Sequence, residues 1–139
     1  YLNFQQELSE DIGAFARWSW NNGQSEIMAF TDIDRSLSGG LSIKGTAWGR
    51  PDDRIGIGGA INMLSTEHAA FFAAGGLGPL VGDGQLPNYT PEKVIESYYA
   101  FQMTKGLVIT ADYQLLLNPA YNGDRGPVHV FSGRLHASF

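Results

Sequence analysis

Hydrophobic and polar positions alternate along most of this chain, and residues 107–117 show the pattern most clearly. Its odd positions there are mainly apolar and its even positions mainly polar: Leu107, Ile109, Ala111, Tyr113, Leu115 and Leu117 against Val108, Thr110, Asp112 and Gln114. Such alternation places one apolar and one polar face on a β-strand. A break rich in Pro and Gly at 118–127 precedes a second alternating segment at 128–139. The two segments are predicted to form an antiparallel hairpin.

The same alternation recurs towards the amino terminus. It predicts further strands over 1–8, 12–20, 36–46, 55–63 and 94–104. Residues 25–34 are ambiguous between a short strand and a loop, and residues 49–54 have the composition of a turn. Segment 65–93 is long and irregular, with a short helix expected over 66–74. The prediction is an all-β chain of about seven strands in an antiparallel meander.

The connections between these strands alternate in length. Those at 9–11, 49–54 and 104–106 are short, whereas those at 21–35, 65–93 and 118–127 are long. Alternate connections of a meander lie at opposite ends, so this asymmetry is typical of an outer-membrane barrel, with short periplasmic turns and long outer loops. The alternation by itself also fits a soluble sandwich, whose apolar face packs on a second sheet. Loop lengths favour part of a transmembrane β-barrel.

Composition narrows the functional classes. The net charge is −5 without a basic run, which argues against a nucleic-acid partner. No cysteine is present, and no apolar run approaches the roughly 20 residues of a transmembrane helix. The mean hydropathy of −0.14 is compatible with a barrel, because half of a barrel's strand positions face water.

The sequence contains no catalytic constellation. His68, His129 and His136 lack metal-ligand spacing, so neither a metal nor another cofactor is expected. The acidic pairs Asp32/Asp34 and Asp52/Asp53 lack the twelve-residue loop of a calcium site and are interpreted as solvated loop carboxylates. The prediction is that the protein is not an enzyme.

Several motifs resemble one known family, in the same order along essentially the whole chain. They are Phe15–Gly23, Thr31–Ser36, Trp48–Asp53, Ala73–Gly78 with Gly82–Gly84, and the tail Asn118–Phe131 with Gly133–Phe139. The tail looks like the carboxyl end of the carbohydrate-selective porins of Gram-negative bacteria. The resemblance implies an outer-membrane barrel of about sixteen strands that passes sugars by passive diffusion.

The resemblance also suggests how the chain reaches the membrane. The terminal Phe139, with Phe131 and Leu135, is similar to the signal by which the barrel-assembly machinery recognises such proteins for insertion. About seven strands are too few to close a single-chain bacterial barrel, which starts at eight. We therefore expect residues 1–139 to be one domain, the carboxyl-terminal portion of a porin.

The polar faces of the predicted strands would line the pore. The candidates for the sugar path are Arg17, Lys44, Glu96, Tyr98, Gln102, Asp112, Gln114 and Arg134. They mix both charge signs with amides, which suits hydroxyl groups better than ions. We expect Arg17, Glu96, Asp112 and Arg134 to contribute to it. The alternative is that such groups only pair with one another and with water, bracing the wall.

Two other functions fit the same pattern. One is a soluble, secreted β-sandwich that binds carbohydrate, and the other is an outer-membrane barrel that anchors a partner and conducts little. Segment 65–93 is expected to be either an outer loop or a constriction folded into the pore. The expected partners are outer-membrane lipid and small sugars, and the oligomeric state stays open.

Overall fold

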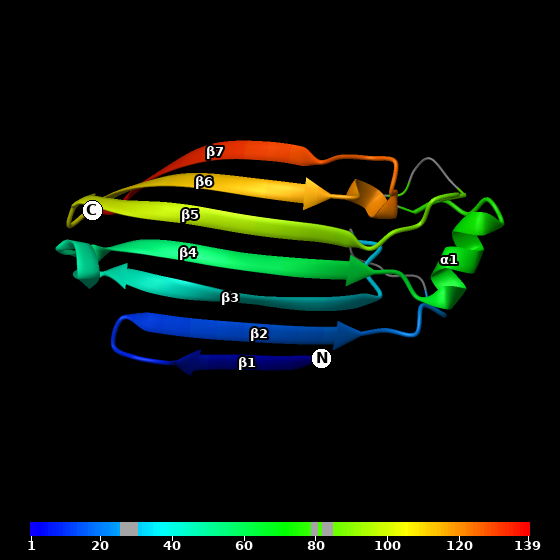
Figure 1. Cartoon of the computed structure of the whole chain (residues 1–139), viewed down its shortest axis with the longest axis horizontal. Coiled ribbons are helices and arrows are strands. Elements are labelled where there is room, and N and C mark those ends of the chain that lie inside the picture. The colour runs from blue at the N-terminus through cyan, green and yellow to red at the C-terminus, as the bar shows by residue number, and fades with distance from the viewer. Residues whose placement is uncertain (26–30, 79–80, 82–84) are drawn as a thin grey trace.

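A single antiparallel sheet of seven strands dominates the computed structural model, which describes residues 1–25, 31–78, 81 and 85–139 (Figure 1). Each strand pairs with its neighbours in the chain, and β1 and β7 form the two edges of the open sheet. The strands are β1 (Leu2–Glu7), β2 (Ile12–Trp20), β3 (Arg35–Gly45), β4 (Arg50–Met63), β5 (Glu92–Thr104), β6 (Leu107–Leu117) and β7 (Val128–Ala137). The predicted all-β meander, consistent with part of a barrel, is confirmed.

The register of the strands separates an apolar face from a polar face. Residues directly opposite each other share a face, so Trp18, Leu37 and Ile61 lie together across β2, β3 and β4. A slip of one residue would turn each of them to the other side. The described residues form no second sheet over the apolar face, and Trp18 and Leu37 keep 50% and 53% of their surface exposed. A two-layer sandwich is therefore not the fold of the described chain.

Among the polar residues that interrupt the apolar face, His129 and Gln6 each have a hydrogen-bond partner. The Nδ1 atom of His129 lies 2.8 Å from the hydroxyl of Tyr113, whose ring stacks on the imidazole. The Nε2 group of Gln6 donates to the carbonyl oxygen of Glu7 at 2.9 Å. Because both groups are satisfied, they fit the apolar face at a reduced cost.

The turn predicted over residues 49–54 is wrong, because β4 begins at Arg50. The bend is tighter: the 3₁₀ helix η1 (Thr46–Trp48) ends at Gly49, whose φ of 75° favours glycine. Asp53 then anchors the strand, since its buried carboxylate accepts from Arg50 and from the backbone N–H of Gln102 at 2.9 Å. Asp53 is thus not a solvated loop carboxylate.

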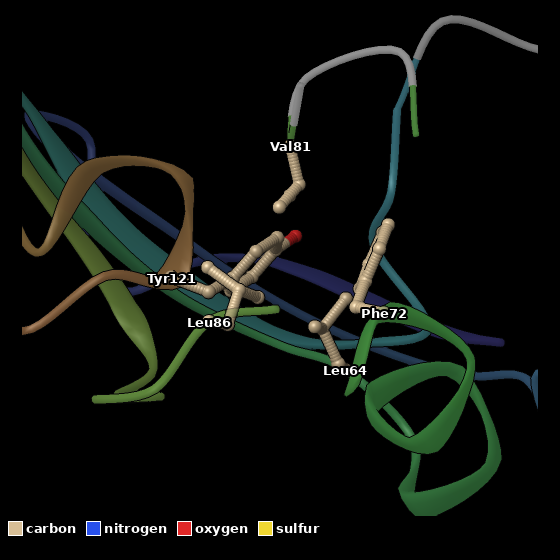
Figure 2. Packing of buried hydrophobic residues seen from close by; sticks show 5 residues of the cluster. All are labelled: Leu64, Phe72, Val81, Leu86 and Tyr121. Carbon is tan, nitrogen blue, oxygen red and sulfur yellow. The ribbon is translucent and has the colours of Figure 1, made fainter. Parts of the chain in front are cut away.

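The hydrophobic core lies at one end of the sheet, where the three long connections meet. Among the described residues, one buried apolar cluster is found: Leu64, Phe72, Val81, Leu86 and Tyr121 (Figure 2). We call this set the cap cluster. The short helix α1 (Thr66–Ala73), which confirms the helix predicted over 66–74, lies beyond the strand ends (Figure 1). No helix in the described ranges is long and apolar enough to cross a membrane.

Asp32 and Asp34 hold the cap cluster together. The prediction that they are solvated is wrong, because only 3% and 2% of their surfaces are exposed. Asp34 accepts from the backbone N–H of Ser65 at 2.8 Å and lies 2.9 Å from Nδ1 of His68. Ser65 in turn caps α1 by accepting from the backbone N–H of His68. The ambiguous segment 25–34 has no strand where it is described, and its residues 26–30 lie outside the described ones.

Tyr121 joins the last long connection to the first. Its hydroxyl donates to the carbonyl oxygen of Asp32 at 3.0 Å. Burial raises the pKa of the Tyr121 phenol, and the negative charges of Glu92, Asp32 and Asp34 add to this shift. The neutral phenol is therefore the form that packs in the cap, by which we mean the cap cluster together with the long connections that carry it.

Truncating Phe72 should loosen the cap while leaving the sheet in place. Phe72 is fully buried, so Phe72→Ala should destabilise the cap by about 3–5 kcal/mol through lost burial and a new cavity. Faster amide hydrogen exchange in residues 64–74, with unchanged exchange in β3 and β4, is the expected result. The matched control is Phe71→Ala, because its neighbour on the same helix is 52% exposed. Equal effects of the two variants would contradict the assigned core.

Alkaline pH should open the same cap. Below pH 10.0, the ordinary pKa of tyrosine, the buried Tyr121 makes its full contribution to the stability of the cap. Above that pH the contribution is lost, because the phenol of Tyr121 ionises in the opened cap before it ionises in the packed one. Cleavage of the cap by subtilisin should therefore accelerate above that pH. Tyr121→Phe should weaken the cap by about 1 kcal/mol at neutral pH and reduce its alkaline sensitivity. An unchanged pH profile in the variant would refute the role of Tyr121.

Candidate functional site

The polar face of the sheet carries all eight side chains predicted for the sugar path. The register places them on one side of the sheet: Arg17, Lys44, Glu96, Tyr98, Gln102, Asp112, Gln114 and Arg134. Whether they contact a solute remains a prediction. Their common face, however, follows directly from the alternation of each strand and from the pairing of neighbours.

Basic groups occupy the polar face of β2, β3 and β4. Arg17 donates from Nε to Oδ1 of Asn3 at 3.2 Å, and the Nζ group of Lys44 donates to the carbonyl oxygen of Glu10 at 2.6 Å. Arg54 lies directly opposite Lys44 and donates to Oγ of Ser42 at 3.1 Å. Sequence reasoning missed Arg54 because it assigned this residue to a turn.

Acidic groups occupy the polar face of β5 and β6. Glu96 accepts from Nε2 of Gln114, directly opposite on β6, at 3.2 Å. Asp112 accepts from the hydroxyl of Ser132, its partner on β7, also at 3.2 Å. Each carboxylate keeps further lone pairs for another donor. The face thus has basic groups on β2 to β4 and acidic groups on β5 and β6, and each set is followed at its edge strand by a charge of opposite sign, Glu7 on β1 and Arg134 on β7.

A hollow of about 870 Å³ lies over the basic groups and reaches the acidic strands. Four of the eight predicted residues line it: Arg17, Lys44, Glu96 and Tyr98. The hollow is also lined by Phe15, which lies on the polar face of β2 and is not among the sequence candidates. An aromatic residue at a polar-face position is the signal that could have identified it.

The other four candidates lie outside the hollow, one at the end of β5 and three on β6 and β7. They are Gln102, Asp112, Gln114 and Arg134. Asp112 and Gln114 are nevertheless connected to it, because Gln114 bonds to Glu96 and Asp112 lies opposite Tyr98. Gln102 lies near the end of the sheet that carries the short turns. Its backbone N–H donates to Asp53, and its carbonyl oxygen accepts from Arg50. The candidates therefore lie on one continuous polar surface, and the hollow occupies part of that surface.

Two of the three residues predicted as an insertion signal lie on the opposite side of the sheet, and the third follows the last strand. Phe131 and Leu135 are on the apolar face of β7, and they are exposed together with Phe139 just past the strand end. Phe131 also contacts the ring of Tyr113 on β6 at 5.1 Å between ring centroids. Their role as a signal stays a prediction.

The described residues include no group of three or more His, Cys, Asp or Glu side chains arranged to hold a metal ion. His68 lies in the cap against Asp34, and His129 lies on the apolar face. What the polar face offers is hydrogen bonding: guanidinium and ammonium donors on one side, and carboxylate and amide acceptors on the other.

Comparison with known proteins gives two relatives of low identity. Porin AaxA of Chlamydia abortus is 23% identical over 137 residues, which cover 99% of this chain and 26% of that protein. Porin AaxA of Chlamydia caviae is 26% identical over 133 residues, which cover 96% of this chain and 25% of that protein. The chain thus spans about a quarter of the length of these relatives. No solved structure gives a significant match.

A family model extends this relationship along the whole chain. The model of the carbohydrate-selective porins matches residues 1–139, which includes every strand of the sheet and the cap. The match agrees with the meander of strands, with the exposed apolar face and with the polar face opposite it. This chain belongs to the carbohydrate-selective porins of the OprB family.

Proposed function

We propose that this chain forms part of the wall of an outer-membrane porin through which small sugars diffuse. Family membership implies a transport channel rather than an enzyme. The observation that carries the rest is the two-sided sheet, whose apolar face is exposed along its strands while its polar face holds the hydrogen-bonding groups. Diffusion through such a pore needs no cofactor and no energy source.

The apolar face fits acyl chains. Large apolar side chains are exposed from one edge strand to the other, with Leu2 on β1, Ile57 on β4 and Leu135 on β7 as examples. Exposure to water of apolar surface on this scale costs about 25 cal/mol per Å², and a bilayer removes that cost. The lengths of β2 to β7, between 9 and 14 residues, match the roughly 9–11 residues that a tilted strand needs to cross.

The two ends of the sheet fit the two sides of an outer membrane. The short connections lie at one end, and the three long connections and the cap lie at the other (Figure 1). Barrels of this class have short turns in the periplasm and long loops outside. We therefore assign the described residues between β4 and β5, which include α1 and most of the cap cluster, to an outer loop. Additional strands of the complete protein would pair with the edges of the sheet and close the pore.

The polar face suits neutral, hydroxylated solutes. It carries both charge signs, whereas a pore that selects ions is lined by one sign. Arg17 and Glu96 present charged donors and acceptors on either side of the hollow, which is large enough for one or two sugar rings. Lipid, sugars and the assembly machinery that inserts barrels are the partners that this function requires.

Removing two basic groups from the polar face should slow sugar entry. In the complete protein, Arg17→Ala together with Arg134→Ala should lower the rate of glucose-driven liposome swelling by about two- to five-fold, because hydrogen bonds from charged groups to hydroxyls are lost. Lys93→Ala is the matched control, since Lys93 is exposed on the opposite face beside Ile61 and Leu117. Unchanged flux in the double variant would refute the proposed path.

A barrel that only anchors a partner would behave differently. Single-channel recordings of the complete protein should show a stable open conductance that sugars partly block. A protein with no measurable conductance would favour the anchoring role.

A further inference from the structure

Two aromatic side chains are found on the polar face of the seven described strands, and both line the hollow. They are Phe15 on β2 and Tyr98 on β5. Phe15 keeps 37% of its surface exposed although it is fully apolar. On a face that would meet water, an exposed phenyl ring next to charged groups calls for an explanation.

Both rings lie against glycines of the neighbouring strands. A Cβ atom added to Gly40 on β3 would lie 2.7 Å from Cε1 of Phe15, and one added to Gly56 on β4 would lie 2.1 Å from Cε1 of Tyr98. A Cβ atom on Gly58 would lie 3.9 Å from Cζ of Phe15. The rings thus fill space that side chains would occupy, and they approach β4 from its two sides.

The floor between the two rings is formed by Gly58, because the ring of Tyr98 covers Gly56 whereas Phe15 reaches Gly58 only at its Cζ atom. Gly56 and Gly58 lie on the same face of β4, about 7 Å apart for alternate residues of a strand. Neither carries a side chain, and both line the hollow. Polar groups border it: Cζ of Arg17 lies 5.6 Å from the centre of the Phe15 ring, and Glu96 lies directly opposite Gly58.

This arrangement matches the surface of a ring-shaped sugar. A pyranose has faces of C–H bonds, which are attracted to the electron-rich face of an aromatic ring, and a rim of hydroxyl groups. Stacking on Phe15 or Tyr98 would turn the rim towards Arg17 and Glu96. An open-chain polyol with the same number of carbon atoms carries a hydroxyl on every carbon, but it has no fixed C–H face.

We propose that Phe15 and Tyr98, seated on Gly40, Gly56 and Gly58, form a stacking subsite that selects pyranose sugars over open-chain polyols. This inference rests on the proposed sugar pore and adds the solute geometry that the pore prefers. The rings also shield the glycine backbone, and a role limited to shielding would affect stability without changing the preference among solutes.

The test compares the swelling rates of liposomes that hold the complete protein in D-glucose and in D-glucitol, its open-chain counterpart. The unchanged protein should pass glucose faster. In Phe15→Leu and Tyr98→Leu, the ratio of the glucose rate to the glucitol rate should fall by about three-fold or more, because the aromatic face is lost. Tyr98→Phe keeps the ring and should keep the ratio.

A glycine pair gives a control that leaves both rings in the chain. Gly56→Ala should lower the ratio by displacing the ring of Tyr98, whereas Gly13→Ala, on the same face with no atom within 4 Å of the added Cβ, should not. Equal passage of the two solutes through the unchanged protein, or an unchanged ratio in folded Phe15→Leu and Tyr98→Leu, overturns the subsite while the sugar pore stands. Absence of any glucose flux through the unchanged protein overturns the pore and the subsite together.

Discussion

The fold depends on one constraint: a sheet with an apolar face needs an apolar environment on that side. In the described chain this environment is not protein, since the sheet is one layer and its leucines and tryptophans stay exposed. The hydrophobic core that a soluble protein would place beneath the sheet is instead a small cluster at the strand ends. Both observations agree with membership of a porin family, because porin barrels face lipid on the outside and water on the inside.

The strands and their faces could be predicted from sequence because period-two alternation is a local property of each segment. The eight lining candidates lie on one face for this reason. The buried carboxylates could not be predicted, because their partners are distant in the chain: His68 for Asp34, and the backbone of Gln102 for Asp53. Single-sequence patterns that indicate polar loops do not reveal such partners.

The hollow was only partly predictable for a related reason. Its charged residues follow from polar positions in each strand, but its shape comes from glycines on β3 and β4 that meet aromatic rings from β2 and β5. Those contacts depend on the register between four strands, which alternation does not specify. Phe15 is therefore missing from the sequence candidates. Arg54 is missing because the composition of residues 49–54 indicates a turn, whereas β4 begins at Arg50.

Charge on the polar face is arranged by strand. Arg17, Lys44 and Arg54 come from β2, β3 and β4, whereas Glu96 and Asp112 come from β5 and β6. The polar face thus carries charged donors on three neighbouring strands and charged acceptors on the next two.

The hydrogen bond from Tyr121 to Asp32 connects residues that are far apart in sequence, and the cap cluster adds side chains from the connection between them. The three long connections are therefore not independent modules. Grafting a foreign peptide into one of them would disturb the packing of the other two. Engineering that aims to display a sequence at this end has to exchange the three connections as a set, or insert at an exposed site that the cluster does not use.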